Sequence, residues 1–269
     1  LPDRSNTHVI AQSTVTRLFE EIFASGWSCP ELIVVWHAGE PLVVPVSFYE
    51  EAFATIDRLR PANVIVKHSF QTNGMLIDAD WCRLFKQWNV GVGVSLDGPR
   101  DLHDLHRKTR SGKGTFDKTI AGIRTLRENA SFLRTFWHEA RRSGRVRFVR
   151  EIDLTLPRVF RPEGAPTRNI QVEPLAMLNV DSHGNVSSFS PELLGLKYEA
   201  YVDYLLGNIR FQSMAEIRDA CLASPLYRDI REGVRACSDA CDYFSVCGGG
   251  APVNKLFENG SFTGTETSY

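Results

Sequence analysis

The sequence predicts an α/β fold built from parallel strand–helix units, arranged either as a barrel or as an open doubly wound sheet. Strand and helix patterns alternate through the first half of the chain, and the first strand, ELIVVWH, is too apolar to be half-exposed. Each of three expected strands then runs into a polar or glycine-containing string. Because ligands gather at the carboxyl ends of parallel strands, this edge is the expected binding site.

The first half is expected to contain three helices and three strands. Apolar residues recur at helical spacing from Thr14 to Ala24, and the strands are expected where apolar residues follow one another without that spacing. Asp78 or Asp80 is expected to cap the third helix. The expected helices are 14–24, 48–59 and 81–88, and the expected strands are 31–37, 63–72 and 91–96.

The second half has a different pattern. Residues 171–189 resemble a hairpin that turns on Gly184. From Ala236 onward the chain is rich in glycine and cysteine, and little regular structure is expected there. A strand is expected over 145–156, a loop over 157–166, and helical segments around 198–206 and 214–222.

Composition narrows the class of protein. The 269 residues suit one large domain, or a large domain and a smaller one, and a hydrophobic content of 43% supports a sizeable core. The formal net charge of −1 gives no basic excess, so neither nucleic acid nor an anionic membrane is an expected partner. The best apolar run, 32–46, is broken by His37 and Glu40, which predicts a soluble protein.

Six cysteines are present, and three of them lie close together as Cys237-x3-Cys241-x5-Cys247. Soft ligands at this spacing, followed by three glycines, fit a thiolate metal site rather than a disulfide framework, and indicate a reducing, cytoplasmic compartment. Structural zinc and simple burial are the alternatives. The other three are expected to be packing residues: Cys29, Cys82 and Cys221.

The strand ends WHAGEP, SFQTNG and SLDGP carry the binding chemistry. Gly39 permits a close backbone approach, and backbone groups near Ala38 are suited to an amino or carboxylate group. Ser95 and Asp97 suit a ribose or an ammonium, and Arg107 offers a planar fork for a carboxylate. Ordinary turn chemistry is the alternative for each string taken alone.

The chain is expected to be incomplete. It starts at Leu1 in the turn-like string LPDRSN. At Ala130–Ser131 two helix-like stretches meet without the strand that an α/β domain would place between them. A motif that is missing from this sequence is therefore expected to lie in residues that the sequence lacks.

The strings WHAGEP, QTNG, SLDGP, HDLHR, KGTFD and CGGG resemble those of radical SAM/SPASM peptide maturases, where SAM is S-adenosylmethionine. WHAGEP resembles the GGEP motif of that superfamily, with Ala38 in place of the first glycine. FSPELLG, YFSVCGGGAPVNKLFENGSF and TGTETSY resemble the cyclophane-forming GrrM/OscB type. The resemblance covers nearly the whole chain.

The resemblance implies a partial (β/α)6 radical SAM barrel over residues 1–165, lacking its start and a part after Ala130. A C-terminal SPASM-type auxiliary iron–sulfur domain is implied over residues 166–269, incomplete at its C-terminus. The implied cofactors are SAM, a [4Fe–4S] cluster whose CxxxCxxC ligands are not in this chain, and an auxiliary [4Fe–4S] cluster.

The same resemblance assigns roles to single residues. One auxiliary cluster is implied rather than two, since Ser182 and Ala251 stand where relatives often have cysteines. Its ligands would be Cys237, Cys241, Cys247 and one residue outside the chain. When the family's SAM-binding positions are carried over one by one, the SAM amino group would lie at Ala38, Gly39 and Glu40. The SAM pocket would be lined by Gln71, Asn73, Ser95 and Asp97. The SAM carboxylate would lie near Arg107.

The implied activity is maturation of a ribosomally made precursor peptide. A 5′-deoxyadenosyl radical would take hydrogen from an unactivated β-carbon, and the carbon radical would add to a nearby aromatic ring, forming a cyclophane. The ring then loses a proton and an electron, so a base is needed, with the auxiliary cluster as the electron acceptor. Glu192 is the candidate base and Glu173 the second candidate. A flavodoxin or ferredoxin would supply electrons.

Three alternatives remain open. Another radical SAM/SPASM modification is one: thioether, epimerisation or formylglycine formation. A non-enzymatic peptide-binding scaffold with structural zinc is the second. A metal- or phosphate-dependent TIM-barrel hydrolase is disfavoured, because the strand ends lack a His-rich or paired-carboxylate constellation.

Overall fold

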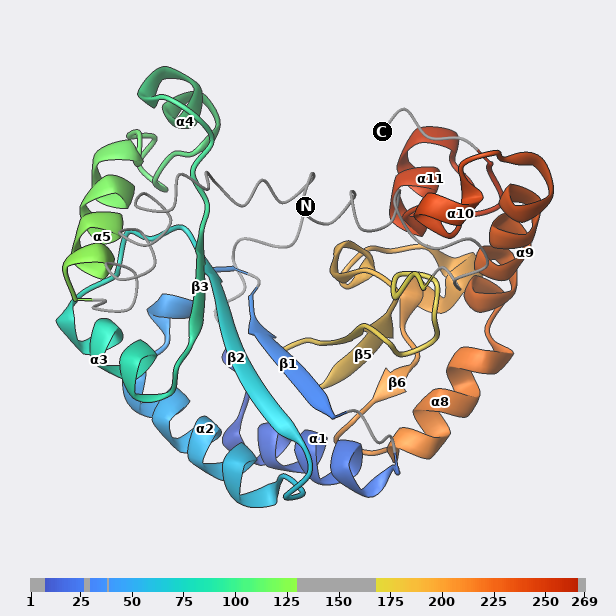
Figure 1. Ribbon diagram of the computed structural model, residues 1–269, viewed down its shortest axis with the longest axis horizontal. Helices are drawn as coiled ribbons and strands as arrows, with labels where there is room; N and C mark the ends of the chain where they lie inside the picture. The colour runs from blue at the N-terminus through green and yellow to red at the C-terminus, as the bar shows by residue number, and fades with distance from the viewer. Residues whose placement is uncertain (1–7, 27–29, 38, 130–167, 266–269) are drawn as a thin grey trace. The chain divides into compact units, whose positions relative to one another are not determined.

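The computed structural model describes residues 8–26, 30–37, 39–129 and 168–265 (Figure 1). The chain divides into two compact units: residues 26–147, here the parallel-sheet unit, and residues 1–25 with 148–269, here the cysteine unit. Each is described by itself. The predicted domain boundary after residue 165, the predicted strand at 145–156, the loop at 157–166 and the Ala130–Ser131 junction lie outside the described residues.

A three-stranded parallel sheet forms the centre of the parallel-sheet unit, as the strand–helix alternation predicted. Its strands β1 (Glu31–Trp36), β2 (Ile65–Thr72) and β3 (Gly91–Val94) are hydrogen-bonded in the order β1-β2-β3. Trp36 lies opposite Phe70, and Thr72 lies opposite Val94. The carboxyl ends of the three strands therefore meet at one edge.

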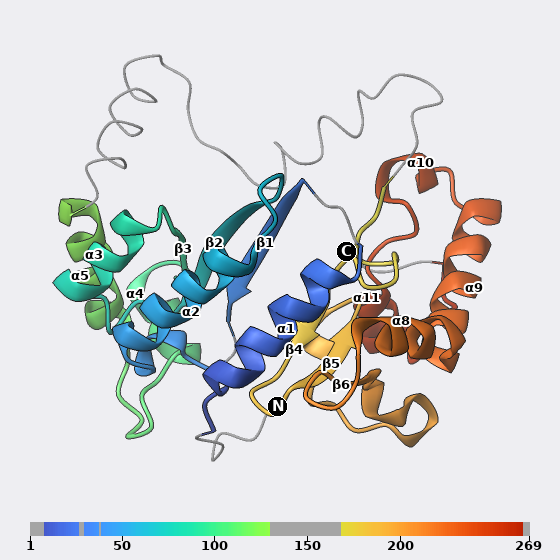
Figure 2. The ribbon, with the colours of Figure 1, turned by 90° about the horizontal axis from the view of Figure 1, so that it is seen from below.

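Helices cover one face of this sheet (Figures 1 and 2). The predicted cap of the third helix is confirmed at Asp78, whose side chain accepts hydrogen bonds of 3.0 Å from the backbone N–H groups of Asp80 and Trp81. The elements are η1 (Pro41–Val43), α2 (Val46–Leu59), α3 (Ala79–Gln87), α4 (Arg100–His106) and α5 (Phe116–Asn129).

Aromatic side chains fill the space between the sheet and these helices. Phe53 of α2 and Phe70 of β2 are fully buried, and the ring of His68 stacks on Phe53 with centroids 3.9 Å apart. Trp36 Nε1 donates to His68 Nδ1 at 3.3 Å. Desolvation lowers the pKa of His68 to about 4, so His68 belongs to the core as a neutral acceptor.

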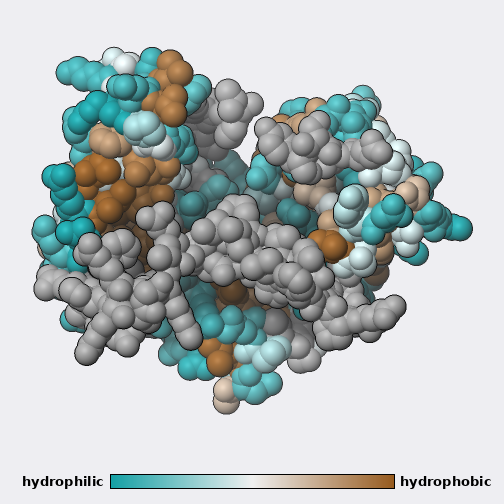
Figure 3. All heavy atoms as spheres, turned by 45° about the horizontal axis from the view of Figure 1, so that its top comes forward, coloured by the Kyte–Doolittle hydropathy of each residue, from teal (hydrophilic) through white to brown (hydrophobic). Residues whose placement is uncertain are grey.

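The expectation that the first strand is buried on both faces is wrong. Ile33 and Val35 of β1 expose 58% and 56% of their surface, and Ile65 of β2 exposes 59%. Exposure alternates along the strand, because the described helices pack on one face only. An apolar strand sequence does not reveal whether its second face is covered. Leu102 and Leu105 of α4 are exposed as well. Figure 3 shows hydrophobic side chains, coloured brown, gathered at the surface of this unit.

The cysteine unit combines α1 (Gln12–Ala24) with a small antiparallel sheet in the order β4-β5-β6. The predicted hairpin is confirmed: Gly184 has a φ of +83°, and the Asp181 carboxylate accepts from the N–H groups of His183 and Asn185. The strands are β4 (Leu178–Val180), β5 (Asn185–Ser188) and β6 (Gly207–Asn208).

The expectation of little regular structure after Ala236 is wrong. Helix α9 continues to Ala240, because its buried residues recur at helical spacing and include Cys237, and two further helices follow within the segment. The predicted helix at 198–206 is instead a kinked 3-10 segment with positive φ at Val202 and Asp203. The helical elements are η2 (Pro191–Leu193), η3 (Glu199–Tyr204), α8 (Met214–Ala223), α9 (Pro225–Ala240), α10 (Phe244–Cys247) and α11 (Pro252–Asn259).

None of the helices in the described ranges is long and apolar enough to cross a membrane.

Candidate functional site

Glu40 organises the strand-end edge of the parallel-sheet unit. Its Oε1 accepts from Thr72 Oγ1 at 2.6 Å and from the Leu42 N–H at 3.1 Å, and its Oε2 accepts from the Asn73 N–H at 2.8 Å. The carboxylate thus joins the loop after β1 to the end of β2. Gly39, just before it, has a φ of +64° and open space where a Cβ would stand, while Ala38 lies outside the described residues.

Gln71, Asn73 and Ser95 lie along the same edge. The Asn73 side chain accepts from the Met75 N–H at 2.9 Å, and the Ser95 N–H donates to Thr72 O at 2.9 Å. The exposed Gln71 side chain lies over Gly93 of β3, where an added Cβ would be 2.1 Å from the Gln71 Oε1. Gly93 therefore makes the room in which Gln71 lies.

Asp97 and Arg107 are brought together, and they bind each other. Arg107 Nε donates to Asp97 Oδ2 at 2.5 Å and Arg107 Nη2 donates to Asp97 Oδ1 at 3.3 Å. This hydrogen-bonded pair lowers the pKa of the Asp97 carboxyl. Both side chains remain partly exposed, at 37% for Arg107 and 43% for Asp97. The planar fork predicted for a ligand carboxylate thus holds a carboxylate of the chain itself.

His103 supports this loop from beneath, in a role that the sequence did not reveal. It is fully buried on α4; its Nδ1 lies 3.3 Å from the Asp97 N–H, and its Nε2 lies 3.0 Å from Thr115 Oγ1. Because Nδ1 accepts, Nε2 carries the proton and donates to Thr115, which in turn donates to Arg107 O at 3.1 Å. The HDLHR string was the only available signal.

The three clustered cysteines occupy different positions in the cysteine unit. Cys237 is 4% exposed on α9, Cys241 follows that helix directly, and Cys247 ends α10; all three are free thiols. Within the described ranges no group of three or more His, Cys, Asp or Glu side chains is arranged to hold a metal ion. The thiols are thus near in sequence but do not form a preassembled coordination shell.

A buried lysine faces the Cys237 thiol. Lys255 of α11 is 3% exposed, and its Nζ donates to Gly233 O at 3.2 Å and to Cys237 Sγ at 3.2 Å. Among the described residues it makes no ion pair with a carboxylate. These two hydrogen bonds place the Lys255 amino group directly beside the Cys237 sulfur.

The glycines after Cys247 form a loop that Asn169 holds in place. Gly248, Gly249 and Gly250 all have positive φ, between +63° and +95°. Asn169 Nδ2 donates to Gly250 O at 2.8 Å and lies 3.3 Å from both Cys247 O and Gly248 O. No local motif around Asn169 pointed to this contact across 81 positions of sequence.

The two candidate bases differ in their surroundings. Glu192 is exposed in η2 and accepts a short hydrogen bond from the hydroxyl of Ser190, which is 1% exposed. Glu173 instead forms an ion pair with Arg168 at 3.0 Å. Of the two candidate bases, Glu192 is therefore the one that has no guanidinium partner among the described residues.

The remaining cysteines behave as expected where they are described. Cys221 is fully buried on α8, and burial raises the pKa of its thiol to about 11. Cys82 is buried on α3, and burial likewise raises its pKa. Both suit packing positions, while Cys29 lies outside the described residues.

Comparison with known proteins places these features in a family. A sequence model described as the radical SAM superfamily matches residues 14–134. An uncharacterised protein of Synechocystis sp. is 33% identical over 329 aligned residues, which cover 99% of this chain and 82% of that protein. A serine-type anaerobic sulfatase-maturating enzyme of Bacteroides thetaiotaomicron is 34% identical over 122 residues, 45% of this chain and 29% of the enzyme. The chain thus spans less than a third of that relative.

Solved structures share the fold. A native anSMEcpe with bound AdoMet matches with a TM-score of 0.67 at 18% identity, covering 91% of this chain and 81% of that one. The same protein with bound AdoMet and a Kp18Cys peptide matches with a TM-score of 0.66 at 17% identity, covering 91% and 82%. At such identity the likeness concerns the fold.

Proposed function

Because this chain belongs to the radical SAM superfamily, we propose that it is a cytoplasmic maturase that forms a carbon–carbon cyclophane crosslink in a ribosomally made precursor peptide. The observation that carries the proposal is the polar strand-end edge built around Glu40, in a fold that anSMEcpe shares while holding AdoMet and a peptide. The family implies a [4Fe–4S] cluster and SAM.

The residues at this edge fit SAM. Gly39 leaves its backbone open, and Asn73, Ser95 and Gln71 present polar groups along the same edge. In this proposal Ala38 and Gly39 receive the amino group of SAM, while Glu40 fixes the loop that presents them, because its carboxylate already accepts three hydrogen bonds. In this proposal the ion pair of Arg107 and Asp97 lies at the end of the site that receives the carboxylate of SAM.

In this proposal the cysteine unit holds an auxiliary cluster whose thiolate ligands come together when the cluster binds. Cys237, Cys241 and Cys247 supply soft donors, and the buried ammonium of Lys255 offsets negative charge at Cys237. When bound, the two clusters and SAM supply one-electron chemistry: a carbon-centred radical that removes a hydrogen atom, and an acceptor for the electron that the aromatic ring gives up. A flavodoxin or ferredoxin is the proposed electron donor.

Glu192 takes the proton that the aromatic ring loses. Its Oε2 accepts from the Ser190 hydroxyl, which is anchored in the core, so the carboxylate is held in a fixed position while remaining open to solvent. Glu173 is less suited because Arg168 already binds it. The product therefore forms with the net loss of two hydrogens from the peptide.

A second candidate function is formylglycine formation. It is favoured by one observation, namely that several relatives are named serine-type or cysteine-type anaerobic sulfatase-maturating enzymes. The sequence match to these relatives covers 45% of this chain or less, whereas the late strings around Cys247 resemble the cyclophane-forming type.

The test is anaerobic incubation of the reconstituted full-length enzyme with its precursor peptide, SAM and a reductant. A cyclophane lowers the peptide mass by about two units, places deuterium from the substrate β-carbon in 5′-deoxyadenosine, and leaves a product inert to aldehyde-reactive hydrazide. Glu192→Gln should slow crosslinking ~10²-fold or more without stopping SAM cleavage, the scale of general-base assistance.

The hydrazide separates the two candidates, since serine oxidation to formylglycine also removes two hydrogens. A product that reacts with the hydrazide would show that the enzyme forms formylglycine and not a cyclophane. Deuterium transfer from the α-carbon without loss of mass would point to epimerisation.

A further inference from the structure

We infer that a groove along α9 binds an extended acidic segment of the peptide substrate, with carboxylates at alternate positions. This inference deepens the proposed function: that the segment is part of the precursor peptide rests on that function. The groove lies within the cysteine unit, and none of the three clustered cysteines lines it.

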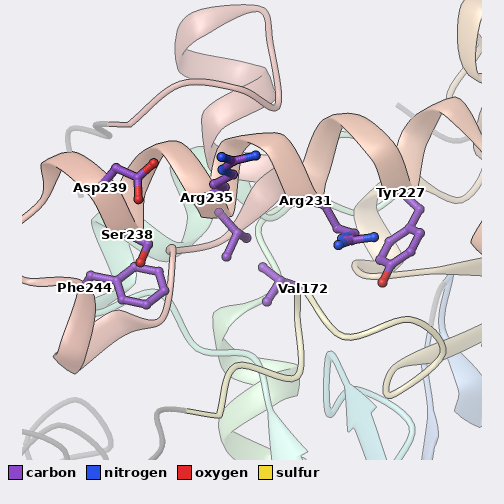
Figure 4. A pocket seen from close by; sticks show the side chains of 8 residues that line it. Val172, Tyr227, Arg231, Arg235, Ser238, Asp239 and Phe244 are labelled. Atoms are coloured by element: carbon purple, nitrogen blue, oxygen red, sulfur yellow. The ribbon is translucent and has the colours of Figure 1, made fainter.

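Two adjoining hollows make up the groove. Their volumes are about 320 Å³ and about 670 Å³, and they share Tyr227, Arg231 and Arg235 of α9. Hollows of this size accommodate several side chains or a short peptide. Figure 4 shows Tyr227 and Arg231 side by side at one end of the smaller hollow and Ser238 and Phe244 at the other.

The groove offers guanidinium groups that no carboxylate occupies. Arg228 pairs with Asp229 at 2.9 Å, but neither Arg231 nor Arg235 makes an ion pair within the described part of the chain. Arg231 lies over the Tyr227 ring at 5.6 Å, which holds its planar fork in a defined place. Free guanidinium groups beside an aromatic ring are suited to bidentate binding of carboxylates.

The spacing of the two arginines specifies the ligand. Arg231 and Arg235 are one helical turn apart, about 6 Å along the α9 axis. In an extended peptide, side chains two residues apart share a face and are separated by about 6.6 Å. Carboxylates at positions i and i+2 therefore match the axial spacing of the two arginine positions, whereas neighbouring carboxylates point to opposite faces.

The other groups lining the groove sharpen this selectivity. Glu232 and Asp239 also line the hollows and repel acidic side chains that are out of register. Val172, Val234 and Phe244 provide apolar contacts for the intervening residue. A folded acidic protein is the rival occupant, but hollows of side-chain size favour a single extended strand.

The test is fluorescence anisotropy of the full-length protein with a rhodamine-labelled nonapeptide of glycine and serine carrying two glutamates separated by one residue. Arg231→Gln and Arg235→Gln should each weaken binding about tenfold or more, the scale for losing one charge-assisted hydrogen bond. Two adjacent glutamates, or two glutamines, should bind as weakly as the variants. Arg218→Gln is the matched control, because Arg218 lies on α8 in an exposed ion pair with Asp219 and outside the groove.

Binding is measured without SAM, and crosslinking is measured separately on a core peptide that has no glutamates. Unchanged peptide affinity in both groove variants would overturn the inference, whatever the crosslinking assay gives. Arginine-dependent binding of an acidic flavodoxin, with no binding of the peptide, would also overturn it. Arginine-dependent binding of the peptide would support the groove even if no cyclophane forms. The absence of a cyclophane would contradict only the proposed reaction.

Discussion

The strand-end edge of the parallel-sheet unit and the cysteine unit differ in how their polar groups are paired. At the strand ends, the Glu40 carboxylate has three donors, and Asp97 has Arg107. In the cysteine unit, the buried Lys255 ammonium faces a thiol and a carbonyl and no carboxylate of the described residues. The carboxylates named at the strand ends are thus paired with donors of the chain, whereas the Lys255 amino group is paired with a sulfur and a carbonyl oxygen.

Under the proposed function, this difference corresponds to two ways of building a cofactor site. A pre-paired edge holds backbone groups in position for a ligand that comes and goes, which suits SAM as a consumed substrate. A buried cation next to a thiol gains its partner when a thiolate-bound group is in place, which suits a resident cluster. Four predictions test the contrast, from the largest expected effect to the smallest.

Removing the Glu40 carboxylate should cost the most stability. Glu40→Ala leaves the Thr72 hydroxyl and two backbone N–H groups without their acceptor, so the free energy of unfolding should fall on the order of 4 kcal/mol. Urea denaturation measures it, with Asp80→Asn in the exposed Asp80–Arg83 pair as the control at under about 1 kcal/mol. Equal effects in the two variants would mean that Glu40 does not organise the edge.

The neutral burial of His68 should make the parallel-sheet unit sensitive to acid. Its folded pKa of about 4 lies below the ordinary value of 6.5, so the unfolded chain takes up a proton first as the pH falls. The stabilisation is complete above pH 6.5 and is lost between pH 6.5 and 4, on the order of 3 kcal/mol. Urea midpoints across this window should fall for the wild type and stay flatter in His68→Gln. Parallel curves for the two proteins would rule out His68 as the source.

The sequence predicted the parallel sheet and its strand ends well, because apolar runs followed by glycine and polar strings reflect local chemistry. It could not predict which partner each polar group chooses. Asp97 and Arg107 were both expected to face a ligand, and they bind each other; His103 and Asn169 act through contacts that only the folded chain creates. The end of α9 past Ala236 was missed, since the cysteines and glycines of the segment that starts there suggested little regular structure.

If the proposed auxiliary cluster is present, the charge of Lys255 should affect its potential more than it affects the fold. Lys255→Met keeps the length of the side chain and removes a positive charge near Cys237, so the midpoint potential of the cluster should fall on the order of 100 mV. Redox titration followed by electron paramagnetic resonance measures it, with the exposed Lys197→Met as the control. Stoichiometric zinc in place of iron at this site would contradict the cluster itself.

The smallest stability effect is expected for Asp97 and Arg107, although the sequence singled out both. The pair is partly exposed, so water competes for both charges, and a double-mutant cycle should give a coupling energy below about 1 kcal/mol. SAM affinity is the sharper measurement. If the fork turns from Asp97 to the SAM carboxylate, Arg107→Ala should weaken SAM binding by about 2–3 kcal/mol in equilibrium dialysis, while Asp97→Asn should leave it unchanged or tighter. If the pair instead acts only through the loop that His103 supports, both variants should lose SAM affinity equally, and the strand-end edge would then bind SAM through its backbone rather than through a charged side chain.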